Sequence, residues 1–427
     1  MARPKILLLT PWAPFPLDAG SRRIWTACRC LKDRYDFSLL TFFNPRTSYS
    51  GVAEPSPDVR MNTAAFMINE RRHLADVFRK VHLVETNHEP GPEFAAGLRL
   101  PDDARRFRSE RMLEKIQEVL RAERPDLVHI EYDMMAPYVD CVRAASPGIP
   151  CLLTHHDMGS VSLFRSYFRE LADWRRFLRL ESWWRRLRYT RDVCRRFDGV
   201  VLVTDSDRRL LDLLIGRGRS HAVSTGVDTR HFSEILPRES REPRSLIFVG
   251  HYPHYPNEQA VVRFVREILP IIRRRMPDVR FYAAGSDPTP PVKALAREPG
   301  VVVTGTLEDI KPPVAGAMAM VAPLQLGRGI KGKLLEAFAL GTPVVASSRA
   351  NEGILAVPER DLLLADSPAA FAEQVFRVLE DGELWRTLSR NGRALVEASH
   401  SWDTKADQLD AVYRGSLRPR RKPAAKP

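Results

Sequence analysis

The sequence predicts an α/β protein built from two doubly wound domains, each with a mostly parallel sheet. Short apolar runs alternate with charged segments of helical period along most of the chain, a pattern typical of strands joined by crossover helices. This alternation stops once, in the polar, proline-bearing stretch 236–245, and then restarts. The 427 residues are too many for one compact core, so two domains are expected.

The strands are expected where apolar residues run together between turn residues. In the first domain they are 5–10, 37–43, 81–86, 126–132, 151–157 and 199–205, and in the second 245–250, 279–285, 300–305, 317–324, 342–348 and 361–366. Helices are expected between them, for example at 109–125, 258–277 and 368–400. Since ligands bind at the carboxyl ends of parallel strands, the loops after these strands are the candidate sites.

The change in composition places the domain boundaries. We expect an N-terminal domain at 1–235, a linker at 236–244 and a C-terminal domain at 245–398. A final helix at 399–417 is expected to pack back on the N-terminal domain, and the basic tail 418–427 to be disordered. Two open sheets joined by a short linker leave a cleft between the domains, where ligand sites are common.

The charge balance and the cysteines restrict the class of protein. There are 66 basic and 53 acidic residues, which gives a formal charge of +13. Such a charge attracts anionic partners. The alternative is that the arginine-rich composition reflects coding bias and has no functional meaning. No run approaches the roughly 18 apolar residues that span a bilayer, and "KILLLT" stops at Pro11, so it indicates a strand and not a signal peptide. The five cysteines lack metal-type spacing and indicate idle thiols in a reducing compartment. We therefore expect a soluble, cytoplasmic protein.

The stretch "GRGIKGKLLEAFALGTPVV" (327–345) resembles a phosphate-binding loop but departs from it at one position. Its glycines and Lys333 follow the spacing G-x-x-x-x-G-K, yet Leu334 stands where a magnesium-binding Ser or Thr belongs. The loop follows an expected strand and opens a short helix that ends before Gly341. A helix N-terminus offers free N–H groups to phosphate, and glycines such as Gly329 let the backbone approach it.

Lys333 and Glu336 share one face of this helix because they are three residues apart. The lysine can meet a phosphate, and the carboxylate can accept hydrogen bonds from two ribose hydroxyls. This arrangement predicts a site for a nucleoside diphosphate that needs no metal. The alternative is an exposed ion pair across one turn, worth about 0.3–0.5 kcal/mol.

The segment 327–354 resembles the donor-binding segment of the large retaining glycosyltransferase family with the GT-B fold, the glycogen-synthase-like group often labelled family 4. The resemblance continues at 14–25, 196–211, 224–232, 245–288 and 300–324, so that it covers nearly the whole chain. Within the group, the sugar transferases of exopolysaccharide assembly are the most similar. The resemblance implies two Rossmann-like domains facing a cleft, with the acceptor held by the first and the nucleotide sugar by the second.

The resemblance also implies roles for individual residues. Glu336 matches the glutamate that binds the donor ribose, Lys333 a basic position at the donor diphosphate, and Gly20 the N-terminal loop glycine near the donor. His156 and Asp157 resemble the His-Asp pair that faces the sugar and the acceptor.

Three positions depart from the family pattern. Arg328 stands where a second glutamate usually contacts the donor sugar, and Gly250-His251 and Asn257 replace a Gly-Arg pair and a lysine. A hypothesis from these departures is that Arg328, Lys331 and Lys333 carry the charge of the diphosphate.

The candidate chemistry is the loss of a diphosphate from a sugar. Lys333 and Arg328 are expected to stabilise the departing charge, a contribution of about 10²–10³ in rate for one such donor. His156, its neighbour His155 and Asp157 are candidates for the base that deprotonates the acceptor. A strand-end histidine bonded to backbone is the alternative, and in retaining members a leaving-group oxygen is thought to remove the proton instead. Glu131 in "HIEYD" is either a cleft residue or a buried, paired glutamate.

We expect a hexosyl- or related glycosyltransferase that uses a nucleotide sugar, needs no cofactor, and glycosylates a glycan or lipid-linked acceptor for cell-surface polysaccharide or glycolipid. The alternatives are a catalytically silent GT-B scaffold, favoured by Arg328, and a sugar-nucleotide epimerase. The Arg- and Trp-rich stretch 165–197 is either a basic amphipathic helix on the inner face of the membrane or a solvated helix packed on its own domain. No nucleic-acid-binding module accompanies the charge.

Overall fold

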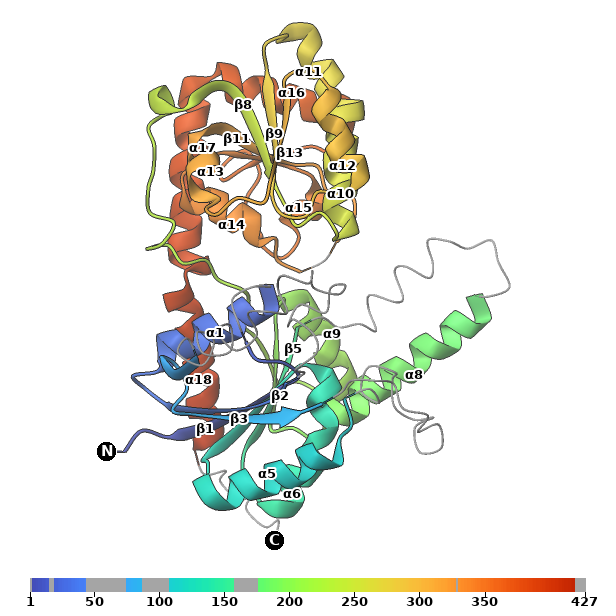
Figure 1. Ribbon diagram of the computed structural model, residues 1–427, viewed down its shortest axis with the longest axis vertical. Coiled ribbons are helices and arrows are strands. Elements are labelled where there is room, and N and C mark those ends of the chain that lie inside the picture. Colours follow the sequence, from blue (N-terminus) through green and yellow to red (C-terminus); the bar gives the residue numbers. More distant parts are fainter. Residues whose placement is uncertain are drawn as a thin grey trace, which may run out of the picture. The chain divides into compact units, whose positions relative to one another are not determined.

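The computed structural model describes residues 2–14, 19–43, 74–86, 107–156, 176–327 and 329–418. The chain forms two compact units, the first made of Met1–Val223 and Ala406–Pro427 and the second of Ser224–Lys405. Each unit has one parallel sheet with helices on its faces, which confirms the predicted fold class (Figure 1).

The sheet of the first unit has the strand order β3-β2-β1-β4-β5-β6-β7. Its strands are β1 (Lys5–Thr10), β2 (Asp36–Phe43), β3 (Lys80–Glu85), β4 (Leu127–Glu131), β5 (Cys151–His155), β6 (Gly199–Leu202) and β7 (Ser220–Ala222). Every neighbouring pair is parallel, with Leu8 of β1, for example, opposite Leu39 of β2 and His129 of β4. The central strands β1, β4 and β5 are almost entirely buried, as apolar runs in a covered parallel sheet must be, whereas the edge strands β3 and β7 are partly exposed.

The helices of the first unit follow the strands in alternation. They are α1 (Ala19–Leu31), α5 (Glu110–Glu123), the 3₁₀ helix η1 (Asp133–Tyr138), α6 (Val139–Ala145), α8 (Arg176–Cys194), α9 (Asp205–Ile215) and α18 (Trp402–Leu417). Caps fix some of their ends: Ser109 accepts from Met112 N at the start of α5, and Thr204 accepts from Asp207 N at the start of α9.

The sheet of the second unit has the order β10-β9-β8-β11-β12-β13. Its strands are β8 (Glu242–Val249), β9 (Arg280–Ala284), β10 (Val301–Gly305), β11 (Ala317–Ala322), β12 (Val344–Ala346) and β13 (Leu363–Leu364). All five pairs are parallel, and the strand order reverses between β8 and β11. In open α/β sheets, such a reversal leaves a crevice at the carboxyl ends of the two strands.

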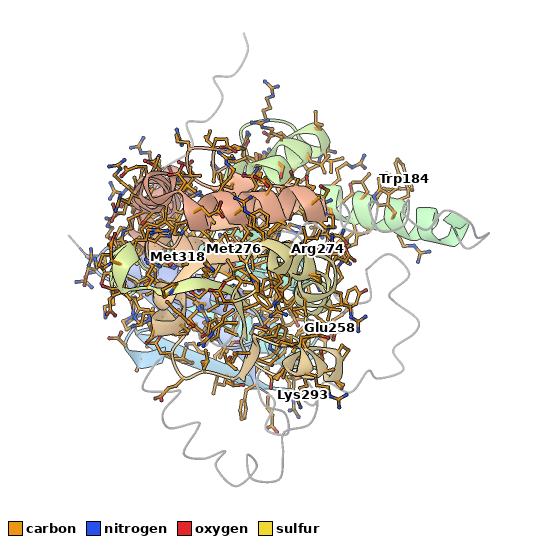
Figure 2. All side chains as sticks on the ribbon, turned by 90° about the horizontal axis from the view of Figure 1, so that it is seen from above. Trp184, Glu258, Arg274, Met276, Lys293 and Met318 are labelled. Atoms are coloured by element: carbon orange, nitrogen blue, oxygen red, sulfur yellow. The ribbon has the colours of Figure 1, made fainter. Side chains whose placement is uncertain are left out.

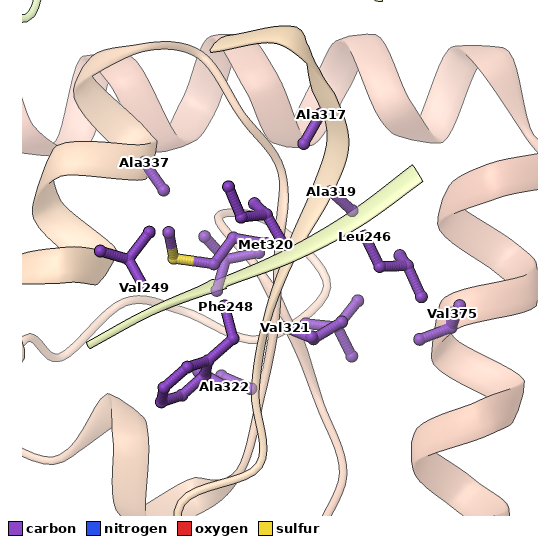
Figure 3. Packing of buried hydrophobic residues seen from close by; sticks show 14 of the residues in the cluster. Leu246, Phe248, Val249, Ala317, Ala319, Met320, Val321, Ala322, Ala337 and Val375 are labelled. Carbon is purple, nitrogen blue, oxygen red and sulfur yellow. The ribbon is translucent and has the colours of Figure 1, made fainter. Parts of the chain in front are cut away.

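The helices of the second unit include two short π-helical segments. The elements are η2 (Arg238–Ser240), α10 (Tyr255–Arg263), η3 (Phe264–Ile268), α11 (Leu269–Arg275), α12 (Pro290–Ala294), η4 (Leu295–Arg297), α13 (Lys311–Gly316), α14 (Gly332–Ala339), α15 (Ser348–Asn351), α16 (Pro368–Glu380), α17 (Gly382–Leu395) and η5 (Val396–His400). Figure 3 shows Leu246 and Phe248 of β8 packed near Met320 and Val321 of β11, inside the largest buried cluster of this unit.

The unit boundaries differ from those expected from composition. The first break falls between Val223 and Ser224, and the expected linker 236–244 forms η2 and the start of β8 within the second unit. Arg241 explains the difference: it is buried, and its guanidinium donates to Ala317 O and Thr342 Oγ1, among other acceptors. A polar residue therefore anchors this stretch to the second unit.

The C-terminal helix α18 contributes to both units. Its residues from Ala406 onward belong to the first unit. There the Tyr413 hydroxyl lies 2.8 Å from Nδ1 of His129 and Tyr35 donates to Asp410 Oδ1 at 2.7 Å. Residues 419–427, the rest of the basic tail, lie outside the described residues.

Candidate active site

The loop 323–331 leads from β11 into α14 in the second unit. Gly327 and Gly329 have φ values of 100° and 65°, in the left-handed region that favours glycine. Lys331 is the N-cap residue of α14, and its side chain makes no capping hydrogen bond. The amide of Leu334 donates to Lys331 O at 2.9 Å, and no N-cap side chain occupies the amides of Gly332 and Lys333, where an external acceptor could bind.

Lys333 lies in the first turn of α14 and is held by two contacts. Its Nζ donates to Oδ1 of Asn257 at 2.7 Å and lies 4.1 Å from the ring centroid of the fully buried Phe248. Burial of the ammonium lowers the pKa of Lys333 to about 7, although the nearby carboxylate of Glu336 acts in the opposite direction. The Lys333 ammonium has lost part of its hydration, and an anionic ligand would compensate for this loss by its negative charge.

Two further basic groups surround Lys333. Lys331 donates to Gly329 O at 2.7 Å, and burial lowers its pKa to about 8. Partial desolvation, followed by the positive charge of Lys333, lowers the pKa of His254. Burial and mutual repulsion lower these pKa values, so a multivalent anion that keeps the basic groups protonated would bind favourably here.

Glu336 follows Lys333 by three residues on α14 and is half-buried, whereas Leu334, Leu335 and Ala337 are fully buried. Its charge raises the pKa of Lys333, which places the carboxylate near the ammonium. The structure thus brings Gly329, Lys331, Lys333 and Glu336 together. Arg328 lies outside the described residues.

Gly250 and His251 form the start of the loop after β8. Gly250 N donates to Ala284 O at 3.0 Å, and Gly285 has a φ of 136°, at which a Cβ would lie 1.8 Å from Gly250 O. The exposed His251 contacts Ser286 Oγ through Nδ1 at 2.9 Å, and its backbone oxygen accepts from Asn257. Hydrogen bonds therefore connect this loop to the end of β9 and, through Asn257, to Lys333.

In the first unit, His156 follows β5 and contacts the residues that end β4. Its Nε2 lies 2.8 Å from Oε2 of Glu131, and its ring stacks on Tyr132 with centroids 3.9 Å apart. Tyr132 has a φ of 71°, an uncommon conformation for a bulky residue that indicates local strain. Asp157, the other half of the predicted pair, lies outside the described residues.

Glu131 is a buried carboxylate among basic groups. Its oxygens lie 3.6 Å from His129 Nε2 and 4.0 Å from Arg23 Nη1, in addition to the His156 contact. Burial raises the pKa of Glu131, but these neighbours prevail and lower it to about 2. Of the two readings that the sequence left open for Glu131, the buried, paired one describes its surroundings.

Gly20 lies in the first turn of α1, next to Ser21. The indole of Trp12 donates to Ser21 Oγ at 3.2 Å, and Trp12 lies 4.9 Å from the ring of Tyr132. A chain of contacts thus joins the start of α1 to His156 at the carboxyl ends of β1, β4 and β5.

The basic stretch 165–197 contains α8, whose side chains are described from Trp183 onward. Arg186 and Tyr189 contact Asp133, whereas the N-terminal half extends away from the sheet of the first unit, with the 55% exposed Trp184 along it (Figure 2). Successive residues lie 100° apart on a helix, so Arg185, Arg186, Arg188 and Arg191 occupy several sides of this part of α8. None of the described helices is long and apolar enough to cross a membrane.

Sequence reasoning missed three members of these clusters. Asn257 was seen only as a departure from a pattern, and His254 and Tyr132 were not considered. Their roles depend on contacts across 76 residues or on backbone conformation. The one available signal was the run of polar residues directly after β8.

Comparisons with known proteins identify the family of this chain. Residues 20–231 match the family described as Glycosyltransferase Family 4, and residues 243–381 match Glycosyl transferases group 1. The chain belongs to the GT-B glycosyltransferase superfamily of group 1 and family 4.

Two of the sequence relatives of this glycosyltransferase-family chain show how far the likeness extends. It is 25% identical over 305 residues to the MMP alpha-(1->4)-mannosyltransferase of Mycolicibacterium hassiacum. The aligned region covers 68% of this chain and 71% of that protein. A 90-residue stretch is 34% identical to YtcC of Bacillus subtilis, but it covers only 20% of this chain and 22% of YtcC.

Solved structures of low sequence identity share the GT-B fold. Sucrose-phosphate synthase from Thermosynechococcus elongatus has a TM-score of 0.65 at 18% identity, covering 97% of this chain and 99% of the other. HepE of Anabaena in complex with UDP has a TM-score of 0.65 at 14% identity, covering 96% and 100%. These likenesses establish the architecture of the GT-B chain and not its substrate.

Proposed function

We propose that this chain transfers a sugar, with retention, from a nucleoside-diphosphate sugar to a glycan or lipid-linked acceptor in cell-surface polysaccharide or glycolipid synthesis. The observation that carries the proposal is the pair of partly buried lysines, Lys331 and Lys333, at the N-terminus of α14, which has no side-chain cap. Glu336 lies one turn further along the same helix. The family membership and the mannosyltransferase relative support this activity.

The donor is assigned to the second unit. The diphosphate would accept hydrogen bonds from Lys331, Lys333 and the first amides of α14, with Arg328, Gly329, Gly250 and His251 beside it. Glu336 would accept two hydrogen bonds from the ribose. A glucose nucleotide is one candidate donor, since HepE of Anabaena has been crystallised with UDP-glucose.

During transfer, the bond between the sugar C1 and the diphosphate oxygen breaks, and both electrons leave with the diphosphate. A hydroxyl oxygen of the acceptor bonds to C1, and its proton passes to an oxygen of the leaving phosphate. The lysines stabilise the negative charge that develops on this leaving group. Their preorganised charge takes the role that a metal has in other transferases, so chelation by EDTA is expected to leave turnover unchanged.

We assign the acceptor to the first unit, with His156 and Asp157, and Gly20 stays assigned to donor binding, as the family resemblance implies. When His156 Nε2–H donates to the carboxylate of Glu131, the basic nitrogen of the neutral ring is Nδ1. His156 would thus orient the acceptor hydroxyl through Nδ1. We further propose a cytoplasmic location with peripheral contact at the inner membrane face through α8, whose exposed Trp184 and arginines suit anionic lipid.

A thermal-shift screen against UDP-, GDP-, ADP- and CMP-sugars tests the function. A ligand at 100 times its dissociation constant adds about 2.7 kcal/mol of stability. The matching sugar nucleotide should raise the melting temperature of the wild type and not of Glu336→Ala. No response to any of them would favour the scaffold reading, which Arg328 in place of the usual acid suggests; a scaffold bearing Glu336→Ala should still support glycan assembly.

A further inference from the structure

Asn257 lies in the first turn of α10 and links three parts of the second unit. Its Nδ2 donates to His251 O at 2.8 Å, its Oδ1 accepts from Lys333 Nζ at 2.7 Å, and its backbone N donates to His254 O at 2.8 Å. The loop after β8 is therefore connected to the N-terminus of α14 through one amide side chain.

The orientation of this amide follows from its two partners. The carbonyl of His251 can only accept a hydrogen bond, and the ammonium of Lys333 can only donate one. Nδ2 must therefore face His251 and Oδ1 must face Lys333. In the flipped orientation, Oδ1 would face the carbonyl oxygen of His251, so that two acceptors met, and the Nδ2 amide would face the Lys333 ammonium, so that two donors met.

The acceptor of the Lys333 hydrogen bond is a neutral amide oxygen. Within the described residues, Lys333 has no carboxylate in ion-pair contact; its partners are the amide of Asn257 and the face of Phe248. Both contacts fix the position of the ammonium without cancelling its charge. A carboxylate in place of the amide would form an ion pair and compete with any anionic ligand.

We propose that Asn257 is a positioning residue that aims the Lys333 ammonium at the diphosphate of the donor, so that this contact is formed before the donor arrives. The role depends on the proposed function, since it presumes that a diphosphate binds at α14. Asn257 acts through Lys333 and does not itself contact the reacting atoms.

A double-mutant cycle on inorganic pyrophosphate binding tests this role. Pyrophosphate is the probe because it contains the diphosphate without a particular base or sugar. Asn257→Ala should weaken its binding about tenfold, Lys333→Ala should weaken it at least as much, and the double variant should match Lys333→Ala alone. Asn391→Ala, an asparagine of α17 that donates to Arg360 O, is the matched control.

Two results would overturn the role of Asn257: additive effects in the double variant, or Asn257→Ala binding as tightly as the wild type. Melting temperatures of all variants separate weak binding from unfolding. A wild type that binds neither pyrophosphate nor UDP, GDP or ADP would instead remove the proposed function and this role with it.

Asn257→Asp adds a readout that a merely structural role would not change. The charged and titratable groups near Lys333 are Glu336 on α14, Lys331 directly before α14, and His254 on the loop after β8. A new carboxylate keeps Lys333 protonated to higher pH, so the decline of pyrophosphate binding with pH should move upward while the affinity at pH 7 falls. An unchanged pH profile would contradict the proposal.

Discussion

His156 and Glu131 form a hydrogen-bonded pair, with Nε2 and Oε2 2.8 Å apart, at the carboxyl ends of the neighbouring strands β5 and β4. Tyr132, the residue after Glu131, stacks on the same imidazole. The hydrogen bond fixes the direction in which the edge of the His156 ring points, and the stacking fixes the orientation of its plane. The basic neighbours of Glu131 hold its pKa at about 2, which makes the pair testable.

Glu131→Gln should destabilise the protein by about 3 kcal/mol at pH 7, because the buried Arg23 loses its counter-charge and His156 loses a charged acceptor. The pKa of Glu131 is about 2 in the folded protein and 4.5 for a free glutamate. Its stabilisation is therefore complete above pH 4.5 and is lost as the pH falls toward 2. Urea unfolding of both proteins between pH 7 and pH 3 should show the difference shrinking; a constant difference would contradict the charge argument.

The lysines of α14 predict a rise of stability with pH. Lys333 has a pKa of about 7 when folded and 10.5 as a free group, so between these values the unfolded chain binds more protons and stability increases, by at most about 1.4 kcal/mol per pH unit. Lys333→Met should flatten this slope in thermal melts from pH 7 to 9. Pyrophosphate should stabilise the wild type more than the variant, and most clearly at the lower pH.

Glu336→Gln separates the ribose contact from the phosphate contact. UDP, or the nucleotide that the screen identifies, should bind about 10–100-fold more weakly, because the charged acceptor of two hydroxyls is lost. Pyrophosphate has no ribose and should bind with nearly unchanged affinity. Calorimetric titrations with both ligands decide the matter, and equal losses for both would argue against a ribose role.

Gly285→Ala should destabilise the second unit by more than about 2 kcal/mol, since the new methyl would collide with Gly250 O and the φ of 136° suits only glycine. Gly305→Ala is the control. Its φ is 70°, and a Cβ there meets nothing within 4 Å, so the cost should be about 1 kcal/mol. Similar melting temperatures for the two variants would refute the close contact.

The exposed side of α8 predicts binding to vesicles that contain phosphatidylglycerol and not to pure phosphatidylcholine. Each arginine near an anionic surface contributes about 1 kcal/mol, so replacing Trp184, Arg185 and Arg188 with alanine should lower the bound fraction more than tenfold. Arg274→Ala combined with Arg297→Ala, two exposed arginines of the second unit, is the control of similar charge. An equal loss in sedimentation assays would point to general charge attraction alone.

Most strands could be predicted because parallel strands covered on both faces have continuous apolar runs. The strand β7 was missed, since its three residues "SHA" contain one small apolar residue and carry no such signal. The helix expected at 368–400 is interrupted where Asp381 accepts from the amides of Glu383 and Leu384 and starts α17. The helical period continues through Asp381, so periodicity alone does not reveal this capping residue.

The candidate site was only partly readable. Lys333 and Glu336 follow from helical spacing, which is local information. The contact of Lys333 with Asn257 joins residues 76 apart, and the depressed pKa of Lys333 arises from burial that depends on the whole fold. The sequence left two alternatives open for the basic stretch 165–197, because composition alone does not determine on which sides of a helix the arginines lie.

The way α18 divides between the units bears on the order of synthesis. Tyr413 is fully buried and bonded to His129, and Asp410 is bonded to Tyr35, so the last helix completes the interior of the N-terminal half. That half cannot reach its native state on the ribosome until nearly the entire polypeptide has emerged. A fragment ending at residue 223 would lack α18 and should be recovered only as an aggregation-prone, incompletely folded species.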